Sequence, residues 1–185
     1  MTPAEAAEYH FLHLGMQYYV AARSAALAGL IPVCDNLFHH AIEMFLKARL
    51  SRAQSLKNLK DSLGHKLKPL WDTFKAEFRS AKLEEFDKLV DELAAFERIR
   101  YPDNVIAEGA AMHLDWGEGD SVGNDATTYR GVVSSVDRLV VRIFELSSKN
   151  PLFFTATLNP YARNALSPHN PVLDSLFKQA AANRE

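Results

Sequence analysis

Cysteine is almost absent from this chain, which has a single thiol at Cys34. No intrachain disulfide can form, so we expect a reducing compartment. We interpret Cys34 as a small buried side chain rather than a reactive thiol. Apolar runs are also short, and none approaches the roughly 18–20 residues needed to cross a bilayer. The first residues are acidic and rich in alanine, unlike a signal peptide. We therefore predict a cytoplasmic protein that does not enter a membrane.

A strong net charge is also missing, since the formal net charge of the 185 residues is −2. This balance gives the whole molecule no attraction for nucleic acid, so such binding would require a local basic patch. The length suits one core with an appended tail. Half of the eight prolines lie between residues 151 and 171. We therefore predict a helical domain over 1–150 and a proline-rich tail, packed on that domain, over 151–185.

The segment around residues 38–50 carries a double apolar pattern. Two adjacent rows of apolar residues recur at three- and four-residue intervals, which is typical of a helix covered on several sides. The rows are Leu37, Ala41, Met44, Phe45 and Ala48, and then Phe38, Ile42 and Leu46. The remaining polar stripe is narrow and contains Asn36, His40, Glu43 and Lys47. We predict that this segment is the central helix of a bundle.

A first helix is expected to precede the central one. It begins at Pro3, a favoured first position, and its apolar seam consists mostly of small residues, so a partner helix can approach closely. Gly29 and Pro32 end it. The turn is very short, so we predict that the first helix and the central helix run antiparallel.

Helical spacing returns later in the chain. It marks a third helix from about residue 67, continuing over 83–100 until Pro102 prevents extension. Valine-rich residues after Asn124 or Asp125 favour a strand by composition, but an opposite polar stripe favours a helix, and we predict a helix there. A short terminal helix is expected over 172–181.

Residues 103–125 interrupt the helical pattern. Four of the eight glycines fall here, which indicates a long loop, or a small hairpin between VIAEG and AAMHLDW. Trp116 in this segment either marks a binding surface or folds back to cover the bundle. The predicted fold class is all-α, an up-and-down four-helix bundle with this loop or hairpin before its last helix and the proline-rich tail after it.

Three short segments resemble, in the expected order, motifs of the HEPN superfamily of all-α bundles. The first is HHAIEMFLKARL, with Ala41, Glu43, Lys47 and Ala48; the second is LGHKLKPLW, with Gly64, His65 and Leu67; the third is RIRYPDN, with Arg100, Tyr101, Pro102 and Asp103. The resemblance covers about residues 5–147. It implies a homodimer packed through the bundle and an association with nucleotides or RNA.

In many members of that superfamily an R-x(4–6)-H motif gives metal-independent ribonuclease activity. At the start of the closing helix, where that motif belongs, Arg130 and Arg138 have no histidine at the required distance. A match occurs only in the tail, at Arg163 and His169. There Arg163 would stabilise charge on the phosphate, and His169 would accept the proton of the 2′-hydroxyl. Pro168 interrupts any helix that would fix this pair.

The same resemblance suggests a groove that binds the phosphate of a nucleotide. Its candidate residues are Lys47, His65, Lys66, Arg98, Arg100 and Tyr101. The alternative is that Glu43 and Lys47 form an ordinary ion pair on a solvated helix surface.

Seven histidines raise the question of a metal site. The Glu-x-x-His pairs of di-iron bundles do not occur in this chain. A mononuclear site from His13, His40 and His113 is conceivable, but no spacing requires it, and we predict no metal and no cofactor. The predicted function is a non-catalytic HEPN-like module that forms a homodimer and binds a nucleotide, RNA or a protein partner. The alternative is a metal-independent ribonuclease, of toxin or defence type, that uses Arg163 and His169.

Overall fold

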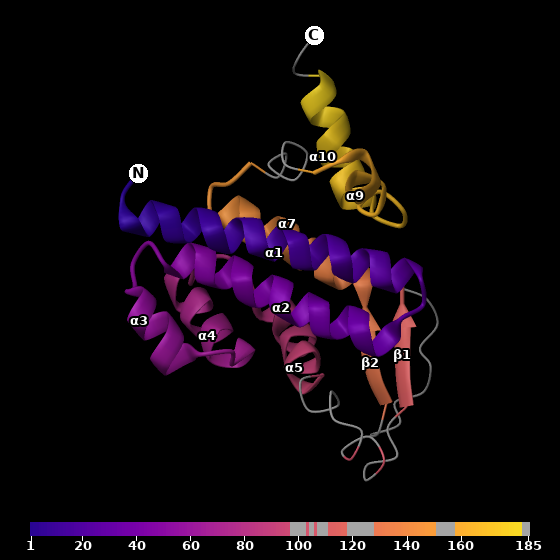
Figure 1. The fold of residues 1–185 in the computed structure, drawn as a ribbon, viewed down its shortest axis with the longest axis horizontal. Coiled ribbons are helices and arrows are strands. Elements are labelled where there is room, and N and C mark those ends of the chain that lie inside the picture. Colours follow the sequence, from indigo (N-terminus) through magenta and orange to yellow (C-terminus); the bar gives the residue numbers. More distant parts are fainter. Residues whose placement is uncertain (97–102, 104–105, 107–110, 118–127, 151–157, 183–185) are drawn as a thin grey trace.

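A computed structural model describes residues 1–96, 103, 106, 111–117, 128–150 and 158–182 (Figure 1). The described chain is mostly helical, which confirms the predicted all-α class at that level. Within these ranges no helix has both the length and the apolar character that a bilayer span requires. Three candidate site residues, Arg98, Arg100 and Tyr101, lie outside the described residues.

Helices α1 (Pro3–Leu27) and α2 (Ile31–Leu50) form the predicted antiparallel pair (Figure 1). The N-terminus of α1 is capped by Thr2, whose hydroxyl accepts from the Glu5 amide while the Glu5 carboxylate accepts from the Thr2 amide. The chain reverses at Gly29, whose φ of 72° suits glycine. The two helices approach closely at Gly15, where an added Cβ would lie 2.7 Å from the ring of Phe45.

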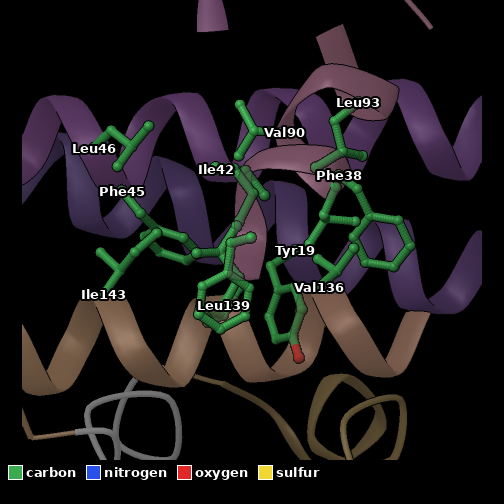
Figure 2. Close-up of a cluster of buried hydrophobic side chains, with 14 of the residues drawn as sticks. Tyr19, Phe38, Ile42, Phe45, Leu46, Val90, Leu93, Val136, Leu139 and Ile143 are labelled. Atoms are coloured by element: carbon green, nitrogen blue, oxygen red, sulfur yellow. The ribbon is translucent and has the colours of Figure 1, made fainter. Parts of the chain in front are cut away.

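Helix α2 is the central helix, as the double apolar pattern predicts. It lies between α1 on one side and α4 (Leu67–Glu77) and α5 (Asp87–Ala95) on the other (Figure 1). It also contacts α7 (Val133–Leu146). Figure 2 shows the resulting core, in which aromatic and aliphatic side chains of α1 and α2 meet those of α5 and α7. These are Tyr19, Phe38, Ile42, Phe45, Leu46, Val90, Leu93, Val136, Leu139 and Ile143.

Between α2 and α5 the chain follows short elements. Helix α3 (Leu56–Asn58) is capped by the Ser55 hydroxyl and continues into a π-helical turn, η1 (Leu59–Leu63). Gly64 ends that turn with a φ of 54°. After α4, a 3₁₀ turn, η2 (Glu84–Phe86), leads directly into α5.

Two strands pair before α7, and this pairing was not among those predicted from the sequence. β1 (Ala111–Asp115) pairs in parallel with β2 (Thr128–Val132), so that Ala111 lies opposite Thr128. The VIAEG segment lies almost wholly outside the described residues. Residues 129–132 were expected in the last bundle helix, but they form β2, and α7 begins only at Val133. The prediction was wrong at this boundary because strand pairing outweighs the local helical spacing.

The described part of the tail packs on the helices. It contains α9 (Pro160–Asn164) and α10 (Pro171–Ala182), and the buried side chains of Leu166 and Leu173 join the core. A buried side chain of α1, Arg23, donates from Nε to the carbonyl of Ala165 at 2.9 Å and from Nη2 to the carbonyl of Pro168. Arg23 thereby ties the segment between α9 and α10 to α1.

The same guanidinium pairs with a buried carboxylate of α7. Arg23 Nη1 contacts Asp137 Oδ2, and the hydroxyl of Tyr19 donates to Asp137 Oδ1. Asn170 completes the group by donating to Tyr19 at 3.3 Å. Burial raises the pKa of Asp137, although the charge of Arg23 and the hydrogen bonds from Tyr19 and Arg23 act in the opposite direction. We call Tyr19, Arg23, Asp137 and Asn170 the tail clasp.

Candidate functional site

A carboxylate without solvent exposure lies in the middle of α2. Glu43 belongs to the narrow polar stripe of that helix, and its Oε1 atom lies 2.6 Å from Lys47 Nζ and 2.9 Å from His65 Nδ1. Its Oε2 atom lies 3.4 Å from His40 Nδ1 and 3.9 Å from His39 Nε2. Four basic side chains therefore surround one buried acid.

The environment of Glu43 keeps it ionised. Burial alone would raise the pKa of this carboxyl group, but hydrogen bonds with His40 and Lys47, together with the charges of Lys47 and His65, lower it to about 2. Lys47 itself is only 5 % exposed. The Glu43–Lys47 pair is therefore buried and is not the solvated surface ion pair of the alternative interpretation.

A pocket of about 300 Å³ opens beside this pair. Its lining is largely apolar, with cationic side chains and the His65 imidazole among it. The lining residues are Phe11, Lys47, Leu56, Leu59, Lys60, Gly64 and His65. We call this cavity the Lys60 pocket. It combines surface suited to a planar ring with groups suited to an anion.

The segment that forms the Lys60 pocket is strongly basic in an otherwise nearly neutral protein. Residues 47–68 contain seven lysines and arginines but only one acidic residue, Asp61. Four of the seven are ion-paired with acidic residues elsewhere, in the pairs Lys47–Glu43, Arg49–Glu77, Arg52–Glu8 and Lys68–Asp91.

The other three, Lys57, Lys60 and Lys66, are exposed and have no ion pair within the described part of the chain. Uncompensated positive charge therefore gathers around this pocket.

The structure brings together only some of the predicted phosphate-binding residues. Lys47 and His65 both line the Lys60 pocket, and the exposed Lys66 is adjacent to His65 in the chain. Sequence reasoning missed Lys60. This residue lies in a short π-helical turn, outside the three segments that resemble HEPN motifs. The excess of basic residues over 47–68 was the available signal for it.

The two residues of the predicted ribonuclease motif, Arg163 and His169, have different surroundings. His169 lines a second pocket of about 320 Å³, together with Trp116, Asp137 and Asn170, and its ring centre lies 5.1 Å from that of Trp116. Arg163 does not line this pocket, and its Nε donates to the carbonyl of Leu158 at 3.0 Å. Nothing in this geometry points both side chains at one phosphate.

Trp116 resolves an alternative that the sequence left open. The indole is partly buried and packs against the core, and its ring centre lies 5.7 Å from the guanidinium carbon of Arg23. It therefore folds back over the protein next to the tail clasp. It also lines the second pocket.

We expect the purified protein to leave a mixed pool of single-stranded RNA intact in EDTA, because Arg163 does not line the pocket that His169 lines among the described residues. Gel analysis of the pool checks this, beside an Arg163→Ala/His169→Ala double variant. Cleavage by the wild type that the double variant lacks would contradict the expectation and make the tail motif catalytic.

Cys34 fits the expected structural role. The side chain is buried at the start of α2, and burial raises the pKa of its thiol to about 12. A thiol in this state is protonated at neutral pH and unreactive.

No protein-family model, curated protein or solved structure matches this chain. The functional argument therefore depends on the geometry of the site.

Proposed function

We propose that this protein is a non-catalytic helical module, with an HEPN-like four-helix bundle, that binds a nucleotide or RNA at the Lys60 pocket. One observation carries the proposal: a largely apolar cavity is lined in part by Lys60, whose charge no ion pair of the described residues compensates. In this arrangement a base would occupy the space between Phe11, Leu56 and Leu59. The phosphate would lie against Lys60 and His65.

The dimensions of the Lys60 pocket support a small ligand or one nucleotide of a longer strand. Its volume of about 300 Å³ is at the lower end of the range for small-molecule pockets, about 300–1,000 Å³. Bases stack or pack against apolar side chains with little sequence preference, whereas lysines contact the phosphates. A single-stranded chain extending past the pocket would meet Lys57 and Lys66.

The arrangement around Glu43 supports binding rather than catalysis. His65 and Lys47 both contact the Glu43 carboxylate, which holds their nitrogen atoms in place. They serve as positioned positive or hydrogen-bonding groups at the edge of the pocket. The proposal also includes a homodimer or a contact with a protein partner. Exposed apolar side chains at the turn between α1 and α2, those of Leu27, Leu30 and Val33, support that part.

A binding titration tests the proposal. Fluorescence anisotropy of a labelled ten-nucleotide single-stranded RNA and of a labelled ATP should show binding to the wild type. A Lys60→Ala/Lys66→Ala variant should bind about tenfold more weakly. Because each phosphate contact contributes about −0.7 to the slope of log K against log salt for single strands, the slope should also become shallower.

A matched control is Lys178→Ala, since Lys178 is an exposed lysine on α10, away from α3 in Figure 1. Its affinity should equal that of the wild type. If the double variant and the control bind equally well, the Lys60 pocket is not the site.

A further inference from the structure

Three potential metal ligands converge on the face of α2 next to the Lys60 pocket. His39, His40 and Glu43 each offer one ligand atom, and these three atoms lie within 4.8 Å of one another. Helical geometry explains the convergence, because residues three and four apart lie on the same helix face. This group differs from the trio of His13, His40 and His113 considered from the sequence. His13 instead contacts the side chain of Gln17 at 2.9 Å.

The imidazole of His39 is oriented by a hydrogen bond from one ring nitrogen to a backbone carbonyl, as is typical of histidines that bind metals. Its Nδ1 lies 3.0 Å from the carbonyl oxygen of Leu93, which can only accept, so Nδ1 carries a hydrogen and Nε2 is the nitrogen that can bind a cation. Ligating histidines characteristically donate their other ring nitrogen to a backbone carbonyl or carboxylate. The residue is only 2 % exposed, yet Nε2 has no hydrogen-bond partner within the described residues and faces Glu43 Oε2 at 3.9 Å.

The two oxygens of Glu43 are directed to different partners. Oε1 accepts from Lys47 and contacts His65, whereas Oε2 is directed to His39 and His40. The Lys47 ammonium contacts Oε1 at 2.6 Å, so Oε2 is the oxygen that faces the two imidazoles. The ammonium also reduces the negative charge of the site, so the two imidazoles must supply much of the affinity.

The site has an approach from solvent through His40. Its side chain is 27 % exposed and lines a pocket of about 460 Å³ with Tyr18 and Asn36, among others. A cation can enter by this route, and water from the pocket can complete its coordination. Three protein ligands with one water position are typical of an open zinc site.

We propose that His39 Nε2, His40 Nδ1 and Glu43 Oε2 bind one divalent transition-metal cation of the Zn²⁺ class. Two imidazole nitrogens favour Zn²⁺, Co²⁺, Ni²⁺ or Cu²⁺ over Mg²⁺ and Ca²⁺, which prefer oxygen ligands. The separation of 3.4 Å between Glu43 Oε2 and His40 Nδ1 matches the spacing of ligands around a tetrahedral Zn²⁺ with bonds of about 2.0–2.1 Å, whereas His39 Nε2, at 3.9 Å, would have to move closer by about 0.5 Å. This site does not depend on the proposed nucleotide binding.

Titration of the full chain with Zn²⁺ and Co²⁺ tests the proposal. After dialysis against EDTA and then metal-free buffer, calorimetry should show one Zn²⁺ per chain. Co²⁺ should give the visible absorption of a four-coordinate nitrogen and oxygen site, which excess Zn²⁺ abolishes. His40→Ala should weaken Zn²⁺ binding at least tenfold, since even loss of an outer-shell partner costs about 10–100-fold. Mg²⁺ should not compete.

The control is His10→Ala, which removes an exposed histidine of α1 and should leave the affinity unchanged. Circular dichroism verifies that both variants are folded, and the Co²⁺ spectrum of the wild type tests the site without any substitution. Equal Zn²⁺ affinity in His40→Ala and His10→Ala would overturn the proposal. The absence of both a Zn²⁺ heat and a Co²⁺ band in the wild type would overturn it as well.

Discussion

Replacing Arg23 by Met is expected to destabilise the native state by about 3–5 kcal/mol, because it removes one partner of a buried ion pair. Arg23 has no solvent exposure and contacts Asp137 as well as the carbonyls of Ala165 and Pro168. Met fills a similar volume but leaves a buried carboxylate and two carbonyl groups without this donor. Urea unfolding followed by circular dichroism measures the loss.

The control for this prediction is Arg138→Met, on α7. Arg138 is exposed, and its Nη2 donates a long hydrogen bond of 3.4 Å to the hydroxyl of Ser135. Its replacement should change the free energy of unfolding by no more than about 0.5 kcal/mol. Limited proteolysis should also cut Arg23→Met earlier between α9 and α10, where the clasp holds the tail. A loss below about 1 kcal/mol for Arg23→Met would show that the clasp contributes little.

The second large effect is expected at Asp35, a buried carboxyl group near the start of α2. The residue is 1 % exposed, and neither side-chain oxygen has a hydrogen-bond partner within the described structure. An added Cβ at Gly131 would lie 2.3 Å from Asp35 Oδ1, so only glycine allows β2 to approach so closely. Burial, and then the negative charge of Glu92, raise the pKa of Asp35 to about 7.

The direction of the pH effect follows from this shift. Between about pH 4 and pH 7 the native state retains the Asp35 proton whereas the unfolded state releases it, so the contribution of Asp35 to stability falls as pH rises. Above pH 7 the native state carries a buried, unpaired charge. Asp35→Asn removes the ionisation and should stabilise the protein at pH 8 by up to about 4 kcal/mol, since one pKa unit corresponds to about 1.4 kcal/mol.

Urea unfolding of the wild type and Asp35→Asn at pH 4.5 and pH 8 measures this effect. The difference between the two proteins should be small at pH 4.5 and large at pH 8. Asp72→Asn, a substitution of a mostly exposed aspartate, should give the same small difference at both values. An Asp35→Asn protein that is equally destabilised at both pH values would contradict the account.

Patterns of neighbouring residues in the sequence predicted where the first two helices lie and where the first one begins and ends. The double apolar row around Phe45 identified the central helix, and Pro3 and Gly29 marked the ends of the first helix. In each case the residues that determine the feature are neighbours in the sequence or lie one helical turn apart.

The sequence did not reveal features that depend on distant partners. The parallel pairing joins β1 to β2, which are separated by an intervening segment of the chain. The spacing of apolar residues within either strand does not indicate which strand it pairs with. In the sequence, Arg23 looks like any charged residue of an alanine-rich helix. Its pairing with Asp137 becomes visible only in the folded structure.

The candidate site shows the same division. The motif around Lys47 and His65 was visible in the sequence, and the structure places both residues at one pocket. Lys60 and the apolar side chains of Phe11 and Leu56 join them only because α1 folds next to the segment after α2.

The measurement that tests the central claim most directly is a nuclear magnetic resonance titration of ¹⁵N-labelled protein with a nucleotide. If the ligand occupies the Lys60 pocket, amide signals of Leu59, Lys60, Gly64 and His65 should shift first, and those of α10 should not move. Shifts confined to Trp116 and Asn170 would place the ligand in the second pocket and contradict the account. So would a spectrum that does not change at millimolar nucleotide.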